Sequence, residues 1–168
     1  MKKAVLLTIV LFAICGNISA QHYFGYFSLD QVMKSMPEYS ESQKSLSELK
    51  EKYDAEMQRV ESDFNSKYEE FLEGQKDFPA IILQKRQTEL QEMMEKNVAF
   101  KEEAKRLYKQ AEDESINSMK SKIMAAIRAI GEQHKYAFII NTDNDACPWV
   151  DSSQGVNVDA EILKLVRR

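Results

Sequence analysis

Two long stretches of the sequence place apolar residues at helical spacing. From Glu38 to Gln75 there is no proline, and Gly74 is the only glycine. Apolar side chains recur there every three or four residues, as in a helix with one apolar stripe. A helix of this extent would be roughly 55 Å long, which exceeds the core of an ordinary domain. The stripe comprises Leu46, Leu49, Tyr53, Met57, Val60, Phe64, Tyr68 and Phe71. Its eleven-residue repeat predicts a nearly straight or slightly right-handed coiled stripe.

The second helical stretch runs from about Ala80 to His134, after a break at Gly74 to Pro79. Two long helices with a short joint predict an antiparallel coiled-coil hairpin over residues 37–134. The segment from Glu95 to Glu103 is poorly patterned, which predicts local flexibility or a bend there. The apolar or small positions of this stretch are Leu90, Met94, Ala104, Tyr108, Ala111, Ser115, Met119, Ile123, Ala126 and Ile130.

Short strand patterns lie on either side of the hairpin. Tyr23–Phe27 and Tyr136–Ile140 are rich in aromatic and branched residues, which favour strands. Cys147–Val150 is a third candidate, which Pro148 confines to an edge or an end of a sheet.

Two short helices complete the flanking segments. Ser28 and Gln31 have the spacing of a capping box that opens a helix at Leu29, and Pro37 interrupts that helix. Asp159 is a candidate N-cap for a final helix from Ala160 to Arg168.

The fold class predicted from these elements is α+β, mainly α, with a long hairpin on a small β body made of residues 21–36 and 135–168. Such a body is too small to be comfortably stable alone, so we expect chains to associate through it. The residues expected to hold the oligomer are Tyr23, Phe24, Tyr26, Phe27, Phe138, Ile139 and Ile140.

The first twenty residues are typical of a secretory signal peptide. Two lysines precede an apolar run from Ala4 to Ile14, which is too short to span a bilayer. We expect cleavage between Ala20 and Gln21. Acylation at Cys15 is less favoured because Ile14 stands where a lipoprotein signal carries a small residue. The sequence therefore predicts an exported protein.

Composition excludes several function classes. The chain without its first twenty residues carries 21 basic against 27 acidic residues, a net charge of −6, with no basic block, so nucleic acid is not an expected partner. Cys147 is the one cysteine left, so no internal disulfide can form. The five scattered glycines allow no phosphate-binding loop, and no cofactor or nucleotide is expected.

Catalytic and metal-binding constellations are weak. His134 and Cys147 could in principle act as base and nucleophile, but a helix-end histidine and a half-buried thiol explain them better. Asp143, Asp145 and Asp151 suggest a metal site. Measured against a calcium loop that starts at Asp143, however, Pro148 replaces the required glycine and Gln154 the bidentate glutamate. The sequence thus predicts a hydrogen-bonded turn at these aspartates, without a metal site, and a protein that is not an enzyme.

Several segments together resemble one known family. The opening from Phe24 to Met33, continued at 35–38, resembles that of the Skp (OmpH-like) family of periplasmic chaperones. The segments 135–140 and 158–163 match the places where that family returns to its sheet and ends in a helix. The resemblance implies a homotrimer of jellyfish shape, in the periplasm of a Gram-negative bacterium. Its three prongs would enclose a cavity for unfolded outer-membrane β-barrel proteins.

The hairpin tip differs from that family. Family prongs are often basic near the tip, whereas residues 67–86 balance four basic against four acidic side chains. Membrane contact is therefore expected to be peripheral at most.

Large apolar residues gather at the same tip. One two-helix hairpin buries only a narrow stripe, so some of them should stay exposed and contact clients. The candidates are Phe71, Leu72, Phe78, Ile81 and Ile82, with Phe78, Ile81 and Ile82 preferred. The alternative is that they close the tip as a local core.

Two function classes remain beside the weak enzymatic one. A holding chaperone acting without ATP would need many weak apolar contacts around a large volume. A structural coiled-coil spacer or adaptor of the cell envelope, binding one folded partner, would use the same helices with every apolar stripe buried.

Overall fold

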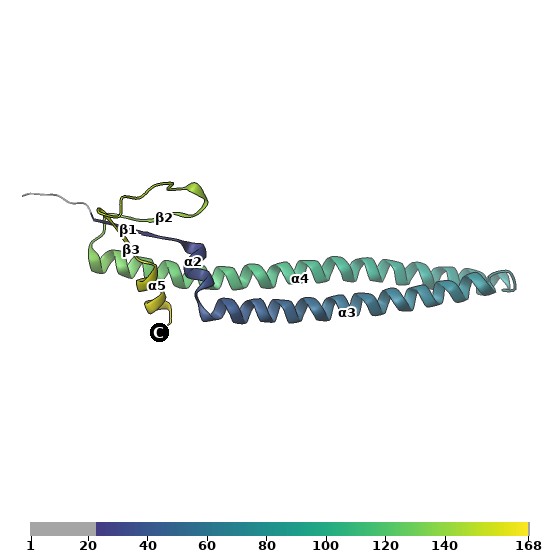
Figure 1. Cartoon of the computed structure of the whole chain (residues 1–168). Coiled ribbons are helices and arrows are strands. Elements are labelled where there is room, and N and C mark those ends of the chain that lie inside the picture. Colours follow the sequence, from purple (N-terminus) through teal and green to yellow (C-terminus); the bar gives the residue numbers. More distant parts are fainter. Residues whose placement is uncertain (1–22, 168) are drawn as a thin grey trace, which may run out of the picture. The chain divides into compact units, whose positions relative to one another are not determined.

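The computed structural model describes residues 23–167 as two compact units (Figure 1). One unit, the hairpin, comprises Met33 to Ile123. The other, the body, comprises the described residues up to Val32 and those from Met124 onward. The elements in chain order are β1 (Phe24–Phe27), α2 (Leu29–Lys34), α3 (Pro37–Gly74), α4 (Ala80–His134), β2 (Ile139–Asn141), the short 3-10 helix η1 (Asp143–Asp145), β3 (Gly155–Asn157) and α5 (Asp159–Val166).

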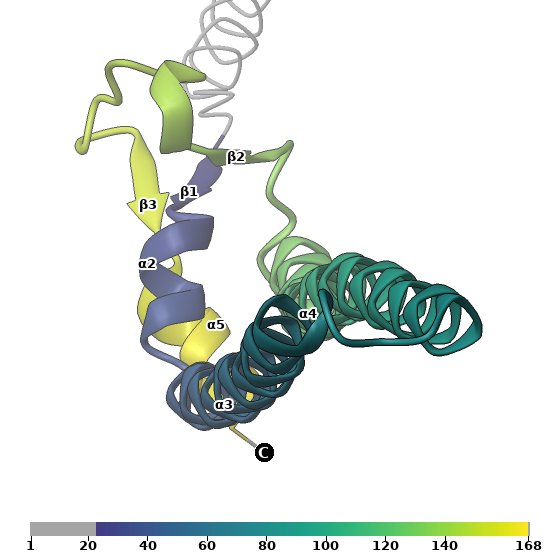
Figure 2. The same ribbon diagram turned by 90° about the vertical axis from the view of Figure 1, so that its right-hand side faces the viewer.

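The two long helices confirm the predicted hairpin. Figures 1 and 2 show α3 running antiparallel beside the neighbouring part of α4. Pro37 stands in the first turn of α3, where its missing N–H costs nothing. Because a residue before proline is pushed out of the helical region, Met36 is extended and separates α2 from α3. The predicted interruption at Pro37 is therefore confirmed.

One detail of the α4 stripe was predicted wrongly. Met94 is 53% exposed, whereas Met93 is half-buried. The stripe continues from Met93 through Asn97 and Phe100 to Ala104, so the helix is regularly patterned across the segment that had seemed irregular. The stripe was not recognised in this segment because the polar residue Asn97 interrupts the apolar pattern.

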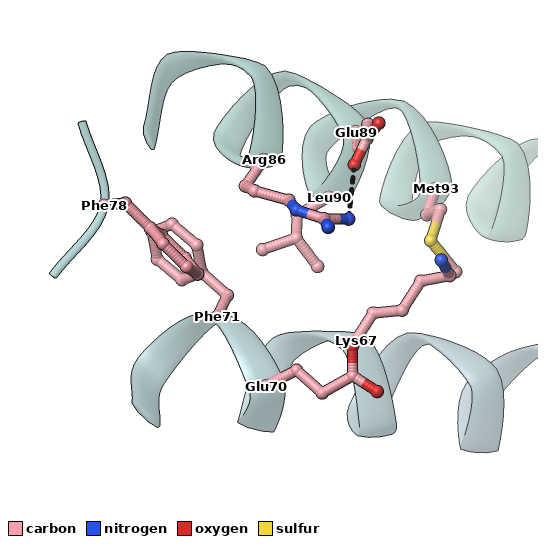
Figure 3. A pocket seen from close by; sticks show the side chains of 8 residues that line it. All are labelled: Lys67, Glu70, Phe71, Phe78, Arg86, Glu89, Leu90 and Met93. Atoms are coloured by element: carbon pink, nitrogen blue, oxygen red, sulfur yellow. Dashed lines mark hydrogen bonds and ion pairs between the residues drawn. The ribbon is translucent and has the colours of Figure 1, made fainter. Parts of the chain in front are cut away.

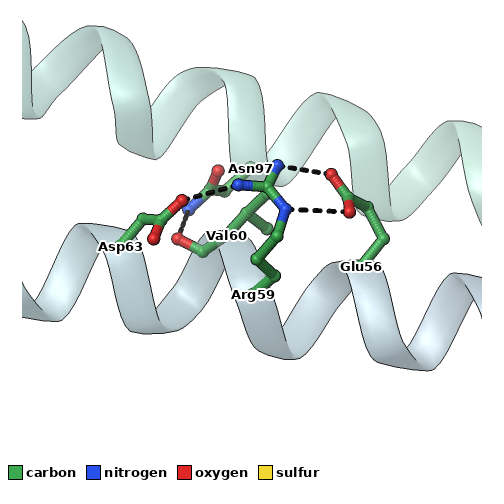
Figure 4. Close-up of polar contacts among 5 residues, drawn as sticks. All are labelled: Glu56, Arg59, Val60, Asp63 and Asn97. Atoms are coloured by element: carbon green, nitrogen blue, oxygen red, sulfur yellow. Dashed lines mark hydrogen bonds and ion pairs between the residues drawn. The ribbon is translucent and has the colours of Figure 1, made fainter.

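Polar contacts fix the register of the two helices. The hydroxyls of Ser42 and Ser115 lie 2.5 Å apart. The Asn97 amide donates to the carbonyl of Val60 at 3.2 Å (Figure 4). The step from Ser42 to Val60 on α3 matches the step from Asn97 to Ser115 on α4. Both contacts thus belong to the same register, and a slip of either helix would break both.

The body contains a three-stranded parallel sheet in the order β2-β1-β3. The first predicted strand is confirmed as Phe24–Phe27. The returning strand begins only at Ile139, because Tyr136 closes the preceding helix: its N–H donates to the carbonyl of Gly131 at 3.1 Å.

The prediction of a third strand at Cys147–Val150 was wrong, since the strand is Gly155–Asn157. Pro148 has no N–H to donate to a ladder. Glycine is required at 155, where a Cβ atom would lie 2.7 Å from the ring of Phe24. The strand Gly-Val-Asn is only three residues long and contains one β-branched residue, so its pattern does not reveal it.

The N-terminus of α2 is capped by side chains from distant parts of the chain. As predicted, the Ser28 hydroxyl accepts a hydrogen bond from the N–H of Gln31, at 3.1 Å. The carboxylate of Asp143 accepts from the N–H of Asp30 at 2.9 Å, and the Asn141 side chain accepts from the N–H of Leu29 at 3.3 Å. These contacts satisfy donors that a helix start otherwise leaves unpaired.

Asp159 was wrongly predicted as the N-cap of the last helix. The helix α5 begins at Asp159 itself, after Val158, and has no side-chain cap. The Asp159 carboxylate instead accepts a hydrogen bond from the N–H of Ser28 at 3.0 Å. The negative charge of Asp159 thus lies at the N-terminus of α2, which is far away in the sequence.

Helix α4 is followed by a residue in the left-handed backbone conformation, and this residue is not a glycine. Lys135 has a φ of 55°, and the bond from Tyr136 N–H to Gly131 carbonyl closes the last turn as in a Schellman motif. This conformation costs a residue other than glycine roughly 1–2 kcal/mol of free energy.

Replacing Lys135 with glycine should therefore stabilise the protein by about 1 kcal/mol, after the extra entropy of glycine in the unfolded chain is subtracted. Urea unfolding at fixed protein concentration measures this change. Lys135→Ala is the matched control, since alanine keeps the steric penalty and should give no gain. Equal stability of the glycine and alanine variants would contradict the explanation.

Candidate functional site

The tip of the hairpin has a small cavity of about 60 Å³ between its two helices. Phe71 from α3, Phe78 from the turn and Leu90 from α4 point toward one another there (Figure 3). The ring of Phe78 lies over Gly74, where a Cβ atom would approach it to 2.4 Å. Phe71 and Phe78 therefore form part of a local tip core.

The remaining tip candidates are exposed. Ile81 is 76% exposed, and Leu72 and Ile82 also face solvent. Adjacent residues of a helix cannot share one face, so Ile81 and Ile82 cannot both pack against α3. The five candidates thus divide into two that contribute to the tip core and three that are accessible.

Burial in the hairpin ends well before the tip. Leu46 and Ala104 are buried, but every residue from 47 to 103, all of which the structure describes, is at least partly accessible. Because two helices enclose only one side of each stripe residue, side chains such as Tyr53, Met57 and Phe64 are only half-buried. This distal seam is a long, incompletely covered apolar surface.

Charged side chains flank the distal seam mostly in pairs along one helix. Arg59 hydrogen-bonds Glu56 at 2.6 and 2.9 Å and Asp63 at 2.7 Å (Figure 4). The hydrogen bond from Arg59 lowers the pKa of Glu56. Such exposed pairs contribute little to stability. Residues 47–103 carry nine basic against fifteen acidic side chains, so the surface beside the seam is acidic.

The sheet of the body presents one aromatic face. Side chains alternate along a strand, and the register pairs Gly25 with Ile139 and Tyr26 with Ile140. Phe24, Tyr26 and Ile140 therefore share one face, where Phe24 stacks on Phe138 at 5.2 Å. Phe138 and Tyr23 are more than half exposed.

The other face of the sheet belongs to the body's own core. Phe27 is 5% exposed, and Ile139 lies on the same face. The described side chains buried with Phe27 in the body are Val32, Ala126, Ile130, Val158 and Ile162. Strand alternation thus separates six of the seven residues expected to join chains: Phe27 and Ile139 face inward, whereas the aromatic face carries Phe24, Tyr26, Phe138 and Ile140. The seventh, Tyr23, precedes β1 and is exposed.

The loop between β2 and β3 holds the residues considered for metal binding and the thiol of Cys147, whereas His134 ends α4. Asp143 binds the start of α2, and Asp151 accepts hydrogen bonds from the N–H and hydroxyl of Ser153 at 2.9 and 2.7 Å. Over residues 23–167 no cluster of three metal-ligating side chains is found. The thiol of Cys147 donates to the carbonyl of Trp149 at 3.3 Å.

Two further features of the described chain bear on the site. Trp149 is 76% exposed, which sequence reasoning had missed. Within residues 23–167 no helix combines the length and the apolar character needed to cross a membrane. The signal peptide predicted at 1–20, with its cleavage between Ala20 and Gln21, lies outside the described residues.

The electrostatics of the body centre on Asp143. Burial alone would raise the pKa of its carboxyl group, but hydrogen bonds from Ser28 and from the Asp30 backbone outweigh burial and lower the pKa below the ordinary 3.8. The charged form of Asp143 is therefore the one that the fold stabilises.

A long helical hairpin with an incompletely covered seam and a small three-stranded parallel sheet place the chain among the α+β coiled-coil hairpin proteins. The family model described as "Outer membrane protein (OmpH-like)" matches residues 23–166, and the chain belongs to that family. The fold is shared with an OmpH-like protein from Caulobacter crescentus CB15, described as a candidate outer membrane chaperone. The TM-score is 0.73 at 9% identity, over 85% of this chain and 82% of that one. No curated protein matches this chain.

Asp143→Asn should destabilise the body at neutral pH by about 1 kcal/mol, the usual size of a lost helix cap. The pKa of Asp143 is lowered in the folded state, so its contribution is present above pH 3.8 and is lost as the pH falls below it. The wild type and the variant should therefore converge in acid. Calorimetry across pH at fixed protein concentration measures this.

Asp145→Asn is the matched control for this prediction. Asp145 is exposed in the same loop and has a φ of 56°, a conformation that asparagine tolerates well. This variant should match the wild type at every pH. A constant gap between the wild type and Asp143→Asn down to pH 2 would contradict the assigned role.

Proposed function

We propose that this protein is a holding chaperone of the Gram-negative periplasm that keeps unfolded outer-membrane β-barrel proteins from aggregating. It works without ATP, metal or cofactor and is not an enzyme. Membership of the OmpH-like family and the predicted export signal support this assignment.

The accessible distal seam is the observation that carries the proposal. A spacer or adaptor bound to one folded partner would be expected to bury its apolar stripe, whereas residues 47–103 leave theirs partly open. An unfolded chain can make many weak apolar contacts along such a seam and still dissociate spontaneously. The exposed Leu72, Ile81 and Ile82 extend this surface to the tip.

Assembly would multiply these contacts. We propose a homotrimer joined through the aromatic face of the sheet, because parallel sheets are normally covered on both faces and residues of the described body cover chiefly the face of Phe27. Three hairpins would then surround one client. Repetition of weak sites raises the overall affinity without any single strong contact.

Ile81→Ser combined with Ile82→Ser should weaken the holding of an unfolded β-barrel at least tenfold, because each exposed side chain covered by a client contributes about 1–2 kcal/mol. Suppression of aggregation after dilution of the client from urea measures this. Helix content should not change, since both residues are exposed near the start of α4.

Ile116→Ser is the control for the tip variant, since Ile116 is as exposed as Ile82 and lies on α4 near the other end of the hairpin. It should leave holding unchanged. If the tip variant holds clients as well as the wild type, client contact lies elsewhere on the seam. Phe78→Ser should instead reduce helicity at the tip, because its ring fills the space over Gly74.

Light scattering should give the mass of three chains. Phe138→Asp should dissociate this assembly, since an unpaired charge would be buried on the aromatic face. Val156→Asp is the control: Val156 pairs with Gly25, so it lies on the opposite face, and it is itself exposed. The assembly should therefore persist. A folded wild-type monomer at micromolar concentration would refute both the trimer and the cavity.

A further inference from the structure

Midway along the hairpin, a groove of about 340 Å³ lies between α3 and α4. Its apolar lining comes from Tyr53 and Met57 on α3 and from Ala104 and Tyr108 on α4. Ala104 occupies the stripe position that the larger Met93 fills one eleven-residue repeat earlier, and it is buried. The groove therefore exists because a small side chain stands where a large one would fit.

The lining suits an adaptable apolar occupant. Methionine is flexible and polarisable, and tyrosine offers a flat apolar ring with a polar edge. The ring of Tyr53 is fixed by an edge-on contact with Phe100 at 6.5 Å between centroids. A volume of this size lies at the lower end of the range for ligand pockets, which matches one or two side chains better than a large cofactor.

Two of the three lysines on the rim of the groove have no ion-pair partner among the described residues. The third, Lys50, pairs with Asp54, and this hydrogen bond chiefly accounts for the raised pKa of Lys50. Within residues 23–167, Lys101 and Lys105 form no ion pair, and neither does Glu102. Lys101 and Lys105 are four residues apart on one helix, an arrangement in which like charges repel. An anion between them would relieve that repulsion.

We propose that this groove binds an unfolded polypeptide segment in which an apolar side chain neighbours a carboxylate. The apolar side chain enters above Ala104, and the carboxylate pairs with Lys101 and Lys105. This inference rests on the proposed holding function and adds a sequence preference to it: extended segments with alternating aromatic and acidic residues bind better than their basic counterparts.

The test uses the full mature protein and a fluorescent peptide in which phenylalanine alternates with aspartate. Ala104→Leu should fill the groove and weaken peptide binding about tenfold. Helix content should be kept, because leucine is nearly as good a helix former as alanine. Lys105→Glu should weaken binding similarly without touching the packing. Lys120→Glu, the same charge change at an exposed position of α4 outside the groove, should leave binding intact.

Three results would overturn the proposal. The first is equal peptide binding by the wild type and the two groove variants, and the second is equal binding of a peptide with lysine in place of aspartate. The third is a change in oligomer mass in Ala104→Leu, which would make the groove a contact between copies. If Ala104→Leu fails to fold, Lys105→Glu decides alone. Aggregation of a urea-diluted β-barrel is measured in parallel. A wild type that suppresses aggregation but shows no peptide preference retains the proposed function and lacks only this site.

Discussion

The whole hairpin is a crossover between two neighbouring parallel strands, so the structure depends on keeping the two ends of that crossover together. The β1–β2 pairing is only three residues long. Hydrogen bonds from the start of α2 to Asn141, Asp143 and Asp159 add to it. Because the entropy cost of closing a loop grows only slowly with its length, a few such contacts can close even a very long crossover.

The features predicted correctly from the sequence are those set by local chemistry. The bounds of α3 and α4 follow from helical periodicity and from Pro37, Gly74 and Pro79, each of which acts on its immediate neighbours. The exposure of Ile81 and Ile82 was likewise predictable, because adjacent residues of a helix cannot face the same way.

The features that were missed depend on contacts between distant segments. Gly155 pairs with Phe24 of β1, whose ring leaves no room for a side chain at 155, and Asp159 caps a helix that begins far earlier in the chain. The place of Phe78 depends on the turn that puts its ring over Gly74. The groove at Ala104 arises only from the register of α3 against α4, which no spacing within one helix reveals.

The eleven-residue repeat has a consequence for how such hairpins can change in length. Buried or half-buried positions recur at this spacing on both helices, as in Met93, Ala104 and Ser115 on α4 and Ser42, Tyr53 and Phe64 on α3. Removing or inserting one repeat in each helix keeps every stripe in phase while changing the reach of the hairpin by about 16 Å. Evolution and engineering can thus resize such a prong in whole repeats, without redesigning its packing.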